Sequence, residues 1–96
     1  MPHPAPLDPS RYLVEWYRSD LTDDLLQQTA HKIGRSAGDL SAEGVTVDLL
    51  LTLFVPDDEV AFCLFAAASR ASVAQVCRRA DLPVHRIAEA LVRRDA

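Results

Sequence analysis

The sequence predicts an α+β domain with the ferredoxin-like element order β-α-β-β-α-β, in which two helices cover one face of a four-stranded antiparallel sheet. Three observations predict it. A strongly apolar hairpin runs through the middle of the chain, over residues 45–67. One helical pattern precedes this hairpin and another follows it. A strand pattern lies near each end of the chain, and the expected spatial strand order is 4-1-3-2.

Length and composition indicate one globular domain of the usual kind. The chain has 96 residues, of which 49% are hydrophobic, and its net charge is −4. No stretch is basic enough to predict nucleic-acid binding. There is no signal-peptide pattern, and no run reaches the roughly 18 apolar residues of a membrane span. We therefore expect a cytoplasmic protein with no nucleic-acid or membrane partner.

The domain is expected over residues 11–92, between two terminal segments. Residues 1–10 contain four of the six prolines, which lack an amide donor and favour extended backbone, so they predict a flexible arm. Residues 93–96 are expected to form a solvated tail.

The first strand is expected over residues 11–17, which are rich in aromatic and β-branched side chains. Successive side chains of a strand point to opposite faces of the sheet. The face toward the helices is expected to carry Tyr12, Val14 and Trp16. The open face then carries Leu13, Glu15 and Tyr17, which places a carboxylate between two large apolar side chains.

The first helix is expected from the N-cap Thr22 to Glu43, with Gly44 as its C-terminal cap. Its apolar residues recur every three or four positions: Leu26, Ala30, Ile33, Ala37 and Leu40. Two glycines inside it, Gly34 and Gly38, predict close approach of another backbone or a break in the helix. His31 lies off the apolar stripe and is read as a surface residue, with metal ligation as the alternative.

The hairpin is expected to pair Val45–Val55 with Glu59–Ala67 through a type I turn that has Pro56 at its first central position. From Leu49 onward the first of these strands is apolar on both faces, and such a strand should be covered on both. Helices cover one face, so a second copy or another partner is expected on the other. The apolar residues expected on that open face are Leu13, Tyr17, Leu50 and Phe54.

The second helix is expected from its cap Ser69 to Ala80, and Asp81-Leu82-Pro83 is expected to end it. A last strand is expected over residues 86–92. Cys63 lies in a strand pattern and Cys77 in a helix pattern. Cysteine is often buried as a small hydrophobic residue, so we read both as buried free thiols, with a disulfide as the alternative.

Several segments resemble a family of small bacterial ferredoxin-like proteins of unknown function. They are Phe62-Cys63-Leu64-Phe65-Ala66-Ala67, Arg78-Arg79-Ala80-Asp81-Leu82-Pro83-Val84 and Arg86-Ile87. The similarity covers about residues 11–92. One member of that family is described as a nickel-binding homodimer, so the resemblance implies a homodimer and makes nickel a candidate ligand. The chain departs from the family in having His85 where aspartate is common, and Leu49-Leu50-Leu51 and Thr52-Leu53-Phe54 where tryptophan and a Ser-Tyr pair are common.

Four side chains are candidate donors to a metal or ligand: Glu15, Glu89, His85 and Cys63. Nickel accepts carboxylate, imidazole and thiolate donors. If the strand phases agree, Glu15 and Glu89 lie side by side on the open face, where they could transfer a proton or hold a cation. Otherwise each is solvated or paired with an arginine such as Arg11 or Arg86. His85 is expected in the loop that enters the last strand.

Three functions stay open, because no catalytic motif is recognisable. The first is a small homodimeric protein that binds a metal ion, nickel among the candidates, or a small apolar ligand at its open sheet face. The second is a small enzyme of the dimeric α+β barrel kind with Glu15 or His85 as acid or base. The third is a non-enzymatic module whose open face binds another protein.

Overall fold

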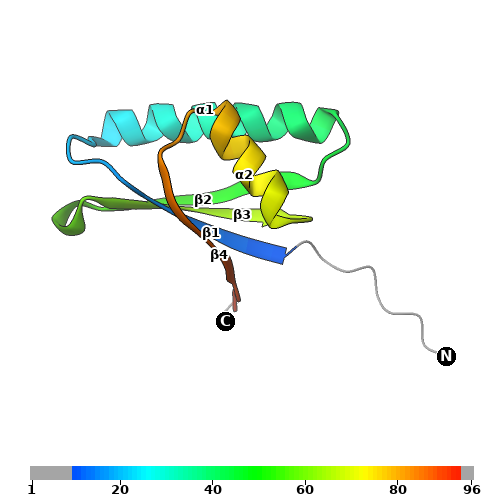
Figure 1. The fold of residues 1–96 in the computed structure, drawn as a ribbon. Coiled ribbons are helices and arrows are strands. Elements are labelled where there is room, and N and C mark those ends of the chain that lie inside the picture. Colours follow the sequence, from blue (N-terminus) through cyan, green and yellow to red (C-terminus); the bar gives the residue numbers. More distant parts are fainter. Residues whose placement is uncertain (1–9, 94–96) are drawn as a thin grey trace.

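The computed structural model describes residues 10–93, so most of the predicted arm and tail lies outside the described residues. Its elements are β1 (Ser10–Tyr17), α1 (Asp23–Ala42), β2 (Val47–Val55), β3 (Val60–Ala67), α2 (Arg70–Arg79) and β4 (Val84–Ala90). The strands form one antiparallel sheet in the order β2-β3-β1-β4. Both helices lie on the same face of this sheet (Figure 1). The predicted ferredoxin-like fold and strand order are therefore confirmed.

Both helices begin at capped residues, as their sequences predict. The Thr22 hydroxyl accepts a hydrogen bond from the Leu25 amide at 3.2 Å, and the Ser69 hydroxyl accepts one from the Ser72 amide at the same distance. Each bond satisfies an amide that has no partner within the helix. After α1 the chain turns at Gly44, whose φ of +92° favours glycine.

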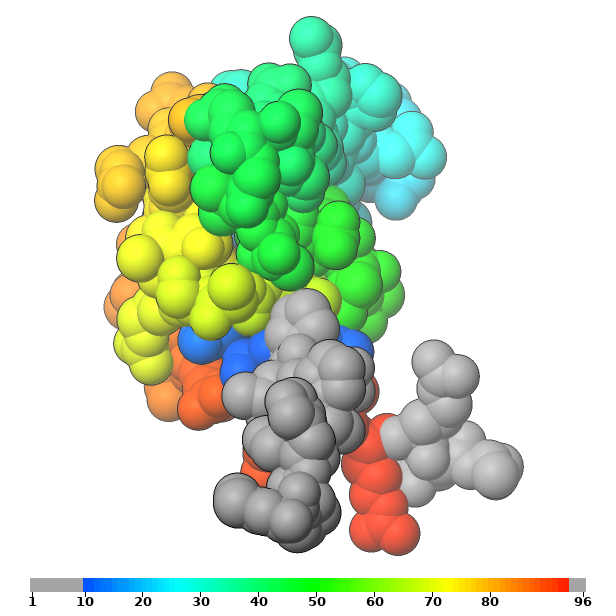
Figure 2. Space-filling view, turned by 90° about the vertical axis from the view of Figure 1, so that its right-hand side faces the viewer, coloured from blue at the N-terminus to red at the C-terminus, as the bar shows by residue number. Residues whose placement is uncertain are grey.

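The core lies between the helices and the sheet face that they cover. Its largest fully buried side chains include Trp16, Phe65, Ile33 and Leu40. Tyr12, Val14 and Trp16 all belong to this core, which confirms the predicted face of β1. In the space-filling view the helices form the upper layer, and β1 and β4 emerge below them (Figure 2). Among residues 10–93, no helix is long and apolar enough to cross a membrane.

The helix α1 runs unbroken from Asp23 to Ala42, so the break predicted near Gly38 is wrong. The predicted close approach of another backbone is wrong as well. A Cβ placed at Gly34 or Gly38 would have no non-local atom within 4 Å. Both glycines are exposed, four residues apart on the solvent side of the helix. Their cost in helix propensity is therefore not offset by packing.

The strand β2 contains a bulge that the alternation of its residues did not predict. Its register against β3 shifts between Leu49 and Leu51, which leaves Leu50 without a partner. Beyond this point Leu51 and Leu53 face away from the helices, whereas Phe54 packs against the core. The prediction that Phe54 lies on the open face is therefore wrong, because one extra residue inverts the alternation.

The hairpin connection is a short 3-10 turn over Pro56–Asp58 rather than a simple type I turn. Glu59 follows it with a left-handed backbone, φ 52°, and its amide donates to the Pro56 carbonyl at 3.1 Å.

Candidate functional site on the open sheet face

The sheet face opposite the helices carries a shallow apolar hollow of about 220 Å³. Three neighbouring strands line it, through Leu13, Leu51, Leu53, Phe62 and Leu64. Residues that pair across antiparallel strands share a face, and Leu13 pairs with Leu64 while Phe62 pairs with Leu53. Leu51 and Leu53 are 54% and 52% exposed. The described chain thus presents a continuous apolar surface to solvent.

A polar cluster borders this hollow at the end of β1. The Tyr17 hydroxyl donates a hydrogen bond to the Glu15 carboxylate, and this bond is the largest cause that raises the pKa of Tyr17. The Tyr17 ring also contacts the His85 ring edge-on, with centroids 5.0 Å apart. Glu15 pairs with Phe62, which lines the hollow. The cluster therefore offers hydrogen-bonding groups beside an apolar surface.

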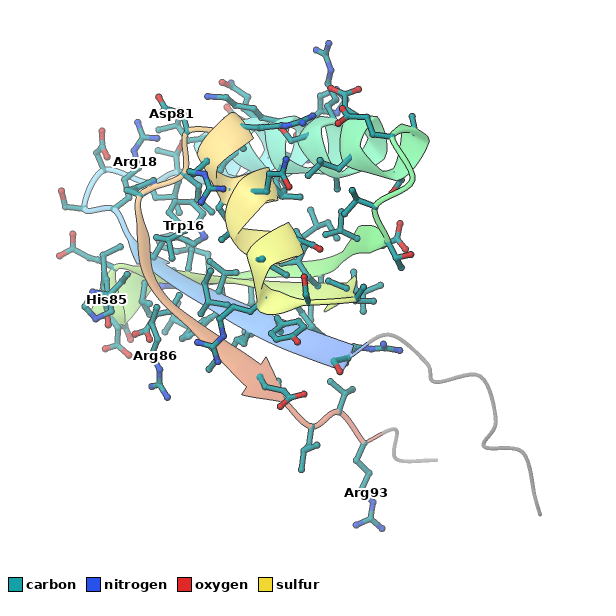
Figure 3. The ribbon with its side chains drawn as sticks, turned by 45° about the vertical axis from the view of Figure 1, so that its right-hand side comes forward. Trp16, Arg18, Asp81, His85, Arg86 and Arg93 are labelled. Carbon is teal, nitrogen blue, oxygen red and sulfur yellow. The ribbon has the colours of Figure 1, made fainter. Side chains whose placement is uncertain are left out.

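His85 lies within β4 and not in the loop where it was predicted, because β4 begins at Val84. Trp16 pairs with Val84 and Glu15 pairs with Arg86, so this register shift leaves His85 without a partner on β1. His85 is exposed and meets Tyr17. Figure 3 shows Arg86 projecting from β4 away from the helix layer.

Glu89 lies on the opposite face from Glu15, so the predicted carboxylate pair is wrong. Glu89 pairs with Tyr12, whose side chain is buried beneath the helices. The physical reason is the phase of β4: Ile87 packs against the core, and a residue two positions further along a strand shares its face. The β4 residue opposite Glu15 is Arg86.

Cys63 belongs to the core and cannot join a site on the open face. Its sulfur accepts a hydrogen bond from Trp16 Nε1 at 3.4 Å, and burial raises its pKa. Burial also raises the pKa of Cys77, to about 12. Both are free, which confirms the prediction of buried free thiols. Each sulfur is therefore protonated at neutral pH.

The predicted metal donors are thus distributed over three places. Glu15 and His85 lie on the open side, Glu89 lies on the helix side, and Cys63 is buried. His31, the alternative donor, is exposed on α1 beside Asp24, Gln27 and Gln28. Within residues 10–93 no three histidine, cysteine, aspartate or glutamate side chains gather closely enough to hold a metal ion.

Sequence reasoning placed Leu13, Glu15 and Tyr17 on the open face and missed four of the residues that line the hollow. The alternation of β3 could have identified two of them, because Phe62 and Leu64 alternate with the buried Ala61, Cys63 and Phe65. Leu51 and Leu53 carried no such signal, since the bulge at Leu50 sets their direction.

Comparison with known proteins establishes a similarity of fold. No family model and no curated protein sequence matches the chain. A crystal structure of SCO4226 from Streptomyces coelicolor A3(2) superimposes with a TM-score of 0.69 at 22% sequence identity. The match covers 88% of this chain and 100% of that one. The chain therefore shares its fold with the Streptomyces protein over the whole length of that protein.

Proposed function

We propose that the protein is a homodimer whose two open sheet faces enclose a site for a small apolar ligand. The observation that carries this proposal is the apolar hollow, in which Leu51 and Leu53 are each more than half exposed. Burying one such side chain completely contributes about 1.5–3 kcal/mol, and leaving several exposed side by side forgoes that stabilisation.

A second copy of the chain suits this face better than an unrelated surface does. Sheets pack face to face at a spacing of about 10 Å through interdigitating apolar side chains, and the hollow is lined by side chains of that kind. A two-fold axis through the face would set each hollow against its copy, because such an interface uses the same patch twice. A chain of 96 residues also gains from a second core, since a small domain buries a modest share of its surface alone.

The ligand is expected to be largely apolar with one polar group. Where the two sheets meet around the hollows without filling them, the facing hollows would enclose about twice the volume of one, within the ~300–1,000 Å³ typical of small-molecule sites. The cluster of Glu15, Tyr17 and His85 would lie at the border of this space and orient the polar group of the ligand.

Nickel binding, which the family resemblance implies, stays a prediction. Within residues 10–93 of one copy, the histidine, cysteine and carboxylate side chains do not gather into a metal site. They therefore do not fit a nickel ion held by a single copy. Any site of this kind would need donors from two copies, and Glu15 and His85 are the open-side candidates.

The decisive measurement is native mass spectrometry of the purified protein, alone and with added divalent nickel. A dimer that loses a small organic molecule on denaturation would support the proposal, and that molecule can be identified after extraction. A strict monomer at micromolar concentration would reject it. A second, different chain that co-purifies in fixed ratio would instead favour the protein-interaction function. Nickel that binds stoichiometrically to the dimer alone would favour the metal ion.

A small enzyme is the second candidate, and the contacts of Tyr17 favour it. Tyr17 is hydrogen-bonded to Glu15 and in ring contact with His85, so a carboxylate, a phenol and an imidazole lie together beside the hollow. Such a set can accept and return a proton. Glu15→Gln removes the base with little change in shape. If this variant still binds the extracted ligand but no longer converts it, the result would establish catalysis. If the variant converts the ligand at an unchanged rate, Glu15 is not the base.

A further inference from the structure

A second surface lies on the flank of the molecule, between α2 and the edge strand β4. It is a groove of about 680 Å³ with small or aliphatic residues along its floor: Ala71, Ala74, Val84 and Ile87. Its remaining lining residues are basic: Arg70, Arg78, His85 and Arg86. The chain turns directly from α2 into β4, so the strand and the helix border the same groove (Figure 1).

The arginines of this groove form no salt bridge within the described part of the chain, and one carboxylate residue, Glu15, lies opposite Arg86 on β1. Within residues 10–93, Arg18 pairs with Asp20 and Arg79 pairs with Glu43, and neither arginine lines the groove. Arg70 donates to the Ile87 carbonyl at 3.0 Å, which leaves its positive charge uncompensated. Three arginine charges therefore gather on a protein whose net charge is −4. This local excess favours an anionic partner.

The spacing of these charges favours an elongated partner over a single small anion. Arg70 and Arg78 are separated by eight positions of α2, which is about 12 Å along the helix axis. For one carboxylate or phosphate group to meet both guanidinium groups, the two side chains would have to bend toward each other along the helix. A chain of acidic groups laid along the helix can meet each of them in turn.

The backbone of β4 specifies which elongated partner fits. β4 is the last strand of the sheet, so one of its edges pairs with no other strand among the described residues. An extended peptide can add to such an edge, and a neighbouring helix then completes the groove around its side chains. Single-stranded nucleic acid would use aromatic platforms for its bases, whereas the floor here is aliphatic. A second copy of the same groove would be repelled by like charge.

We propose that the α2–β4 groove binds an extended acidic segment of another protein, which adds to β4 as a fifth strand. Alternate side chains of that segment point to opposite faces of the sheet. The side chains on the helix side lie over Ala71 and Ala74 and include the acidic groups that meet Arg70 and Arg78. The side chains on the other face lie beside Arg86. Arg70 then leaves the Ile87 carbonyl, which becomes available to an amide of the incoming strand.

The test uses the full-length protein and a fluorescent peptide of about nine alternating glutamate and valine residues, the length of an ordinary strand or slightly more. Fluorescence anisotropy measures binding at low salt and at physiological salt. Reversing one groove charge, Arg78→Glu, is expected to weaken binding about tenfold or more. Arg35→Glu makes the same charge change on the exposed surface of α1, outside the groove, and is expected to leave binding unchanged.

A peptide with methylated backbone nitrogens separates strand addition from simple charge attraction, because it keeps its carboxylates and loses its amide donors. Weaker binding of the methylated peptide, with amide NMR shifts confined to β4 and α2, would support the proposal. The proposal would be overturned by equal loss of binding in Arg35→Glu and Arg78→Glu, by equal binding of a lysine–valine peptide, or by tighter binding of a single-stranded oligonucleotide. Absence of peptide binding at millimolar concentration would overturn it as well.

Discussion

At the scale of single residues, burial decides the chemistry of the two cysteines. Both lie in the core and contribute as small apolar groups, and the Cys63 sulfur additionally accepts a hydrogen bond from the Trp16 indole. Removing a thiol from water disfavours the thiolate, which is why the pKa of each is raised. A cysteine in this setting is a packing residue, and the free energy of unfolding depends on whether its thiol keeps its proton.

Cys77 gives a pH dependence whose sign follows from its raised pKa. Its ordinary pKa is 9.0 and burial raises it to about 12, so between these values the unfolded chain loses a proton that the folded chain keeps. The free energy of unfolding should fall there by up to about 1.4 kcal/mol per pH unit, and below pH 9 this group should contribute no pH dependence. Urea unfolding at a series of pH values measures this slope.

The variant Cys77→Ala provides the control, because it removes the titrating group and leaves the rest of the core in place. It is less stable at every pH through its lost packing, so the slope is the quantity to compare. We expect a shallower fall above pH 9 in the variant than in the natural chain. Parallel curves would show that Cys77 does not retain its proton on folding.

At the scale of elements, the bulge in β2 is the feature that shapes the candidate site. It turns Leu51 and Leu53 toward the open face and returns Phe54 to the core. Removing the unpaired Leu50 would leave Leu49 and Leu51 as ordinary neighbours on opposite faces, with every later side chain on its present face.

Deletion of Leu50 should therefore be tolerated. We expect the shortened chain to fold, with a circular dichroism spectrum like that of the natural protein and a cooperative thermal transition. Deletion of Leu64 is the matched control, because β3 pairs with both neighbours there and loss of one residue inverts the faces of half the strand. A Leu50 deletion as damaging as the Leu64 deletion would mean that the bulge itself is required for folding.

The same bulge marks how far the sequence predicts the structure. Helix caps, element order and the faces of β1 depend on local patterns, and Thr22, Ser69 and Trp16 all behave as predicted. The position of a bulge depends on pairing with another strand, and three consecutive leucines in β2 carry no signal for which one is extra. Phe54 was misplaced for this reason.

The prediction for β4 was wrong about which face of the sheet Glu89 occupies. Ile87 was the informative residue, since an isoleucine beside a helix is expected in the core and Glu89 must then share its face. The candidate site was also predicted only in part, because one of its contacts depends on the position of β4. Glu15 and Tyr17 were placed correctly from β1, whereas their contact with His85 required knowledge of where β4 begins.

At the scale of the whole molecule, the two faces of the sheet have different roles. The helix-covered face holds the core and accounts for the fold, while the open face keeps a set of large apolar side chains in water. Such a surface is stabilising only when something covers it. The proposed dimer therefore makes a prediction that separates folding from association.

Leu53→Glu should give a folded monomer. The substitution places a charge in the lining of the hollow at the proposed interface, and because Leu53 is 52% exposed in the single chain, the fold itself should tolerate it. Sedimentation velocity would then show half the natural mass, with an unchanged circular dichroism spectrum. Leu91→Glu is the control: Leu91 is also an exposed leucine, it follows β4 outside the hollow, and that variant should remain a dimer. If both variants stay dimeric, the two copies meet on another surface and the hollow is open to a different ligand. If both become monomeric, residues beyond β4 belong to the interface and the two sheets meet over a wider area than the hollow alone.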